Sequence, residues 1–319
     1  MRVLVTGANG FVGKHLCRFL LENGFSVAGA VRTESGLDHL PDGVTGVIVG
    51  EVGSNTEWGA ALTGVDSVVH LAARVHIIKE RSQDPLAAFR EVNVEGTRCL
   101  VEKAAACGVS RFVFLSSVGV NGEETEEPFS EEDPPNPHDP YSQSKWEAEQ
   151  DLVERVSRAG ELKVVVLRPP LVYGPNGVGN LVRLLAWVDR GIPLPLASVR
   201  NRRSFVYVGN LVHAIGHCLE HPSAANQTFL VSDGEDVSTP ELIRELGQAL
   251  NRPVRLFPVS PTILKVAGLA TGRSKDIQRL VGSLTMSTEK VSRLTGWNPP
   301  FGWKDGIRET ARWYSSSRS

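Results

Sequence analysis

Short, continuous apolar segments alternate with longer segments of helical periodicity through the first two-thirds of the chain. An apolar run with no polar alternation is typical of a strand that is buried on both faces, as in a parallel sheet covered by helices. The helical segments have the spacing expected of connections between such strands. The pattern therefore predicts an α/β fold with a doubly wound parallel sheet. The predicted strands are RVLV, SVAGAV, VTGVIVG, SVVHLA, RFVFLSS and KVVVLRP, and the clearest helices are GKHLCRFLLENG and PLAAFREVNVEGTRCLVEKAAACG.

The regular alternation ends after Pro169, where Gly- and Pro-rich stretches begin. A further strand and helix then follow in FVYVGNLVHAIGHCLEH, and the segment TPELIRELGQALN has a helix start at Thr239 and Pro240. We expect residues 1–170 and a returning segment near 205–235 to form the main domain. Residues 171–204 and 236–319 are expected to form a smaller C-terminal α/β portion.

Composition narrows the class of protein. The chain has 319 residues, of which 41% are hydrophobic and 22% charged, with a net charge of −2, so it is an ordinary globular protein with no expected nucleic-acid partner. Its four cysteines lack the spacing of a metal site, which predicts no metal and a reduced, cytoplasmic setting. The sequence contains no apolar run of about 18 residues, so we expect no membrane span.

A glycine-rich loop directly follows the first predicted strand. VLVTGANGFVGKHL places Gly7, Gly10 and Gly13 at the start of the first helix. Glycine lets the backbone approach a pyrophosphate closely, and the helix N-terminus offers free N–H groups to it. The alternative is a plain strand-to-helix turn, but the strand, loop and helix order at the start of the chain favours a Rossmann-type dinucleotide site.

The end of the second strand bears on the choice of dinucleotide. An NAD site usually has an acidic residue here to accept from the ribose hydroxyls, whereas this chain has Val31 followed by Arg32. A guanidinium suits a 2′-phosphate, so NADP(H) is favoured, with NAD(H) as the alternative. Arg32 could also simply face solvent.

Tyr141 and Lys145 lie four residues apart at the start of a predicted helix, in DPYSQSKWEAEQ. Residues with this spacing share one helix face in any helix. The spacing alone is therefore consistent with both an acid–base pair and two surface residues.

Five motifs occur in one order: TGANGFVG, HLAA at 70–73, NVEGT at 93–97, LSSVGVNG at 115–122 and the Tyr141 to Lys145 segment. With them the chain resembles the extended short-chain dehydrogenase/reductases, and more narrowly the NAD-dependent epimerase/dehydratase family of nucleotide-sugar enzymes. The resemblance covers nearly the whole length. It implies a Rossmann-type dinucleotide-binding domain and a C-terminal nucleotide-sugar-binding portion.

The resemblance also implies a catalytic set of Ser117, Tyr141, Lys145 and Asn93. Tyr141 would exchange a proton with a sugar oxygen, Lys145 would favour its phenolate and contact the nicotinamide ribose, and Ser117 would bond the same oxygen. The positions implied for the cofactor are Gly7, Gly10, Phe11, Val12, Gly13, Arg32, Glu51, Val52, Leu71, Ala72, Ala73, Asn93, Ser116, Tyr141, Lys145 and Pro169.

For the substrate, the resemblance implies contacts from Ser117, Asn180, Leu181, Arg203 and Arg279. The two arginines match positions that contact a diphosphate, which planar guanidinium groups bind well. Asn180 and Leu181 match a segment that holds the nucleotide.

Two departures from the family pattern bear on the reaction. Leu171 and Asn121 replace an Asn and a Tyr that are common in the epimerases, which favours a reductase that converts UDP-4-keto-6-deoxy-N-acetylglucosamine to UDP-N-acetylquinovosamine for surface polysaccharide. A UDP-hexose or UDP-N-acetylhexosamine 4-epimerase with tightly bound NAD and a non-catalytic dinucleotide sensor are the alternatives. No acidic pair follows Ser117, which argues against a dehydratase.

Relatives of this kind often form homodimers through helices, so we expect a homodimer. Apolar positions that could serve either the core or that interface are Leu86, Phe89, Val92, Leu100 and Val101.

Overall fold

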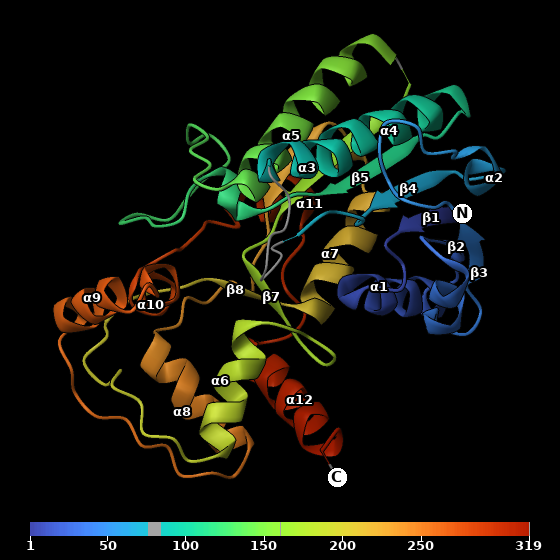
Figure 1. Cartoon of the computed structure of the whole chain (residues 1–319). Helices are drawn as coiled ribbons and strands as arrows, with labels where there is room; N and C mark the ends of the chain where they lie inside the picture. The colour runs from blue at the N-terminus through green and yellow to red at the C-terminus, as the bar shows by residue number, and fades with distance from the viewer. Residues whose placement is uncertain (76–83, 160, 319) are drawn as a thin grey trace.

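In the computed structural model, which describes residues 1–75, 84–159 and 161–318, seven parallel strands form one sheet in the order β3-β2-β1-β4-β5-β6-β9 (Figure 1). The order steps outward from β1 in both directions, as in a doubly wound Rossmann-type fold. The predicted fold class is confirmed. The strands are β1 (Arg2–Thr6), β2 (Ser26–Val31), β3 (Thr45–Ile48), β4 (Ser67–His70), β5 (Arg111–Leu115), β6 (Lys163–Arg168) and β9 (Gln227–Leu230).

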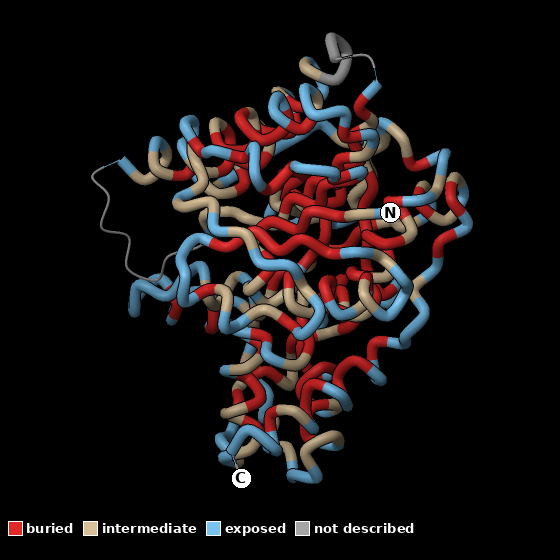
Figure 2. The backbone as a smooth tube through the Cα atoms, turned by 90° about the vertical axis from the view of Figure 1, so that its right-hand side faces the viewer, coloured by how far each residue is buried: buried red, intermediate tan, exposed pale blue. Residues whose placement is uncertain are grey.

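Successive residues of these strands are all apolar because alternate side chains enter two different cores, one on each face of the sheet. In β1, Val3 and Val5 belong to the core on one face of the sheet, and Leu4 belongs to the core on the other. In β5, Val113 joins the first core while Phe112 and Phe114 join the second. The centre of the molecule is accordingly buried (Figure 2).

Helices cover both faces of the sheet (Figure 1). The first core is closed by α1 (Phe11–Glu22), α7 (Val208–Glu220) and α11 (Glu289–Thr295). The second is closed by α2 (Gly59–Leu62), α4 (Gly96–Ala106) and α5 (Pro140–Ala159), with α3 (Pro85–Arg90) packed on α5.

The segment that follows Asp84 was expected to be one helix, but a π-helical turn over Glu91–Glu95 separates α3 from α4. Phe89, Leu100 and Val101 are buried inside the chain, so they serve its core. The remaining short helices of the first half are η1 (Glu34–His39) and η3 (Val118–Val120).

The C-terminal part forms a core of its own around a two-stranded parallel sheet of β7 (Leu171–Tyr173) and β8 (Phe205–Tyr207). Figure 1 shows α6, α8 and α12 gathered below this small sheet, and α9 and α10 side by side at an outer end. These helices are α6 (Asn180–Asp189), α8 (Thr239–Ala249), α9 (Pro261–Ala270), α10 (Ser274–Val281) and α12 (Trp303–Ser316), and η4 (Pro222–Ala224) precedes β9. Within the described ranges, no helix is long and apolar enough to cross a membrane.

Candidate active site

The glycine loop between β1 and α1 has the geometry of a dinucleotide site. Gly7 has a φ of +65°, and a Cβ there would lie 3.1 Å from the amide nitrogen of Ala72. A Cβ at Gly13 would clash with the Gly7 carbonyl oxygen. The N-terminus of α1 has no side-chain cap and no acidic residue in its first turn, so it suits an anion. Phe11 and Val12 open this helix.

A buried chain of hydrogen bonds fixes the loop to the next strand. Thr6 Oγ1 accepts from the amides of Leu71 and Ala72, at 3.1 and 3.0 Å, and therefore donates its own proton to His70 Nδ1, 2.7 Å away. The imidazole must then carry its proton on Nε2, which lies 3.1 Å from Thr97 Oγ1. Burial lowers the pKa of His70 to about 3, so the ring is neutral. This network positions the HLAA segment beside Gly7.

Asn93 connects that segment to the helix that carries the tyrosine. Its side chain accepts from the Arg74 amide at 2.8 Å and donates to the Arg74 carbonyl at 3.0 Å and to Ser144 Oγ at 2.9 Å. Asn93 is buried on the π-helical turn. These contacts hold the backbone of residue 74 to α5 and so help to position the site.

Tyr141 and Lys145 both lie on the first two turns of α5. Lys145 is buried, and its ammonium donates to the Leu115 carbonyl at 2.8 Å and lies 4.4 Å from the centre of the Phe114 ring. Burial lowers the pKa of Lys145 to about 7, and Glu149 opposes this shift. The pair is therefore not an exposed surface pair.

The pKa of the phenol shifts in the direction opposite to the one expected from a neighbouring ammonium. The pKa of Tyr141 is raised, first by burial and then by the charge of Asp139. The Lys145 ammonium is directed at the end of β5 instead. Tyr141 is thus held in its protonated form, which is a proton donor.

Ser117 follows β5 and caps the short helix η3, where its hydroxyl oxygen accepts from the Gly119 amide at 3.1 Å. A Cβ at Gly119 would be pressed against the Ser142 hydroxyl, which shows how closely this loop packs on the start of α5. Ser117 is half-buried, and it is brought to the same end of α5 as Tyr141.

The Ser116 side chain is directed toward a buried ion pair. It donates to Glu149, which forms a buried ion pair with Arg168 at 2.5 Å. Arg168 also donates to Asn121 Oδ1 at 3.0 Å. Asn121 is therefore part of this buried network.

At the expected ribose end, Arg32 and Glu51 form an ion pair with an N–O distance of 3.4 Å. Both side chains are exposed, at 67% and 79%. The site expected to discriminate between NAD(H) and NADP(H) therefore contains both a cation, Arg32, and a carboxylate, Glu51. Val52 packs close to Gly96, and the Pro169 carbonyl accepts from the Val118 amide at 2.9 Å.

Residues 3–232 match the model of the NAD dependent epimerase/dehydratase family. The chain belongs to this family. The predicted resemblance is confirmed, and it extends over the whole main sheet and the candidate catalytic residues.

Individual relatives of this epimerase/dehydratase chain agree with the assignment. It is 41% identical to a UDP-glucose 4-epimerase of Vibrio cholerae, over 97% of this chain and 94% of the relative. It is 32% identical to the N-acetyl-alpha-D-glucosaminyl-diphospho-ditrans,octacis-undecaprenol 4-epimerase of Escherichia coli O157:H7, over 79% of this chain and 73% of the relative. The solved UDP-glucose 4-epimerase of Thermus thermophilus, a complex with NAD, superposes with a TM-score of 0.79 at 29% identity, covering 99% of this chain and all of that one.

In the C-terminal part of the chain, the two predicted diphosphate residues, Arg203 and Arg279, lie close enough for their charges to interact. Arg203 is half-buried, and its guanidinium donates to the Gly282 carbonyl at 3.1 Å. Burial lowers the pKa of Arg203, and the nearby charge of Arg279 lowers it further, while Glu124 opposes the shift. Two guanidinium groups that repel each other are well placed to hold an anion.

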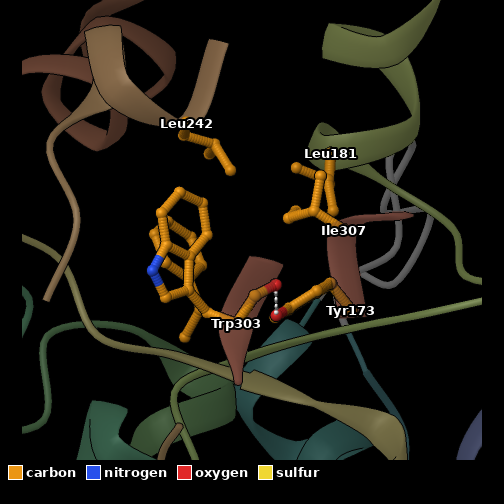
Figure 3. A pocket seen from close by; sticks show the side chains of 6 residues that line it. Tyr173, Leu181, Leu242, Trp303 and Ile307 are labelled. Carbon is orange, nitrogen blue, oxygen red and sulfur yellow. Dashed lines mark hydrogen bonds between the residues drawn. The ribbon is translucent and has the colours of Figure 1, made fainter. Parts of the chain in front are cut away.

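The predicted nucleotide segment is split between two environments. Asn180 is exposed at the start of α6, whereas Leu181 is buried. Leu181 lines a small apolar pocket with Leu242, Trp303 and Ile307, shown in Figure 3. The Leu181 side chain therefore packs in the C-terminal core.

The sequence reasoning missed the residues that support the site from behind. His70 and Glu149 were not singled out, although each is a polar residue inside an apolar or helical pattern, at positions that proved to be buried. His70 ends the short, fully buried strand β4, and Glu149 follows Lys145 by one helical turn. A polar residue at each of these two positions was the feature of the sequence that could have indicated a supporting role.

Proposed function

We propose that the protein catalyses hydride transfer at C4 of a nucleotide sugar and that the net reaction is 4-epimerisation. The observation that carries the proposal is the start of α5, where Tyr141 and a buried Lys145 lie on the helix that packs against the Ser117 loop. The 41% identical relative is named for this reaction, which supports it.

A nicotinamide dinucleotide fits the loop around Gly7, because the close backbone approach and the uncapped helix N-terminus are suited to its pyrophosphate. When bound, it supplies a hydride acceptor or donor. Lys145 is the cation on the same helix face as Tyr141 that would bond the ribose hydroxyls.

In epimerisation Tyr141 would take the proton of the C4 hydroxyl as the hydride leaves C4 and would return it to the same oxygen when the C4 ketone is reduced, while Ser117 bonds that oxygen. An epimerase and a reductase share the reducing step. The epimerase reduces a ketone that stays bound to the enzyme, whereas the reductase reduces a ketone taken from solution. Arg203 and Arg279 hold the diphosphate, so the sugar is anchored at a distance from the reacting carbon.

Net reduction of a 4-keto sugar is the second candidate. The raised pKa of Tyr141 favours it, because a reductase needs only the proton-donating form. UDP-4-keto-6-deoxy-N-acetylglucosamine is the substrate to test, with UDP-N-acetylquinovosamine as the product and surface polysaccharide as its use.

One experiment separates the two. The purified protein is incubated with UDP-glucose, UDP-N-acetylglucosamine and the 4-keto sugar, each with and without NADH or NADPH, and products are identified by NMR. Interconversion of C4 epimers without coenzyme consumption supports epimerisation. Stoichiometric coenzyme oxidation with the 4-keto sugar alone would replace it with the reductase, and the absence of any product would overturn both.

The choice of dinucleotide follows from the Arg32–Glu51 pair. Arg32 favours the 2′-phosphate of NADP(H), and Glu51 favours the ribose hydroxyls of NAD(H), which the Thermus thermophilus relative binds. We expect Glu51→Gln to raise the affinity for NADPH relative to NADH, and Arg32→Ala to lower it, in a fluorescence titration. Equal ratios in both variants would show that the pair does not select the dinucleotide.

We also propose a homodimer that uses α5. Val153 on this helix is 66% exposed, and α3 packs beside it. Light scattering of the wild type and of Val153→Arg tests this proposal, with a dimer expected for the first only.

A further inference from the structure

Helix α9 exposes large aliphatic side chains to solvent. Among its ten residues, only Leu264 and Gly268 are buried, and they pack toward α10. On the remaining surface Ile263, Val266 and Leu269 are 61%, 60% and 71% exposed. They are spaced three residues apart, so they form one apolar stripe on the helix.

This stripe differs from scattered exposed hydrophobics elsewhere on the protein. Single exposed aliphatic residues are normal on a protein surface, but a contiguous group marks a contact with another apolar surface. Ala267 and Ala270 extend the exposed apolar surface of the helix. Figure 1 shows α9 at an outer end of the molecule, where a flat surface could reach it.

Positive charge predominates on α9, on α10 and in the turn that joins them. Residues 261–281 contain Lys265, Arg273, Lys275 and Arg279 but only one acidic residue, Asp276. The four basic residues are exposed. No ion pair is formed by Lys265, Arg273 or Lys275 within the described part of the chain. The chain as a whole has a net charge of −2, so this excess is local.

From these observations we propose that the α9 stripe docks on the surface of an anionic lipid bilayer. An apolar helix face with basic residues around it is the combination that lies in the interface of such a membrane. A second copy of the chain fits less well, because a symmetric contact through this patch would bring the basic residues of both copies together.

Docking has a consequence for the site. Helix α10 packs on α9 and carries Arg279, whose charge acts on Arg203. Arg279, one of the two candidate diphosphate residues, therefore lies on the same two-helix unit as the stripe.

Sedimentation with vesicles tests the proposal on the full chain. Vesicles of phosphatidylcholine alone are compared with vesicles that also contain phosphatidylglycerol. We expect binding to the anionic vesicles, reduced by roughly tenfold or more in Ile263→Gln/Val266→Gln/Leu269→Gln because three inserted aliphatic groups are lost. Lys265→Gln/Arg273→Gln/Lys275→Gln is expected to lose the preference for anionic lipid, since each basic residue near such a surface contributes to binding.

The matched control is Ile48→Thr, which removes an aliphatic side chain, 50% exposed, far from α9 in sequence. It should bind vesicles as the wild type does. Absence of binding to anionic vesicles, or equal binding by the α9 triple variant, would overturn the proposal. So would a solution mass that falls by half in that triple variant, because the stripe would then be a contact between copies.

Failure of the docking proposal is distinguishable from failure of the proposed function. The substituted positions lie outside the candidate catalytic and substrate residues, so dinucleotide binding and turnover of the free nucleotide sugar should be unchanged in every variant. Vesicle binding without turnover would leave docking intact and count against the reaction alone.

Discussion

Asp233 is a buried carboxyl group, and the hydrogen bonds around it are compatible with its protonated form. Its Oδ1 accepts from the Tyr207 amide and from Asn210 Nδ2, both at 2.7 Å. The Tyr173 hydroxyl lies 2.8 Å from Asp233 Oδ2 and 2.9 Å from the Trp303 carbonyl, and the latter bond is drawn in Figure 3. A hydroxyl has one proton for these two acceptors. A proton on Asp233 completes the network, because Oδ2 then donates to Tyr173, which donates to Trp303.

An asparagine at position 233 should make the same hydrogen bonds as the protonated Asp233, and it cannot ionise. In Asp233→Asn the amide oxygen accepts from Tyr207 and Asn210, and the amide nitrogen donates to the Tyr173 hydroxyl. Burial raises the pKa of Asp233 from 3.8 to about 6, and the three hydrogen bonds only partly oppose the shift. A difference of about two pKa units corresponds to about 3 kcal/mol between the two protonation states.

The direction in which stability changes with pH follows from the raised pKa of Asp233 in the folded state. Between pH 4 and pH 6 the folded protein holds a proton on Asp233 that the unfolded chain has lost, so the contribution of this carboxyl to stability is present at low pH and is lost as the pH rises through about 6. We therefore expect the free energy of unfolding of Asp233→Asn, relative to wild type, to rise by about 3 kcal/mol from pH 4 to pH 7 and then to level off.

Urea denaturation at a series of pH values measures this difference directly. Other titrating groups contribute equally to both proteins and cancel in the comparison. The control is Asp42→Asn, which removes one negative charge from an exposed position. A difference between Asp233→Asn and wild type that does not change with pH, or that falls as the pH rises, would refute the reasoning.

Three further predictions concern the site. Gly13→Ala should abolish dinucleotide binding in a calorimetric titration, because its Cβ meets the Gly7 carbonyl, whereas Gly59→Ala, where the structure has open space, should bind normally. Arg203→Ala should raise KM for the nucleotide sugar by about 10- to 100-fold with little change in kcat, as expected for a lost charged hydrogen bond, and an unchanged KM would remove Arg203 from the diphosphate site. Because burial lowers the pKa of Lys145 to about 7, the ammonium is lost as the pH rises, so kcat/KM should fall above about pH 7, and a profile flat to pH 9 would show that its charge is not required.

The fold was predictable because burial on both faces of a parallel sheet leaves a direct mark on the sequence. Val3, Leu4 and Val5 are all apolar since each enters a core, and the same pattern recurs in every central strand. The π-helical turn at Glu91–Glu95 was not predictable in this way, because one extra residue in a helical turn hardly changes the periodicity.

The positions of the site were easier to predict than its electrostatics. The glycine loop and the Tyr141–Lys145 spacing are local features, and the structure places them as expected. The raised pKa of Tyr141 depends first on burial by the folded chain, and the direction of the Lys145 ammonium depends on Leu115, which is 30 residues away in sequence. Interactions between distant residues of this kind leave no pattern in the sequence.

The central claim is that Tyr141 exchanges the proton at C4 during hydride transfer. Its most direct test is the turnover of Tyr141→Phe beside that of Tyr314→Phe, a tyrosine on α12 whose hydroxyl accepts from Arg318. We predict that Tyr141→Phe loses about 10²- to 10⁴-fold in kcat while its dinucleotide dissociation constant is nearly unchanged, as expected for removal of a general acid, and that Tyr314→Phe keeps its activity. Turnover of Tyr141→Phe within a few-fold of wild type would contradict the account.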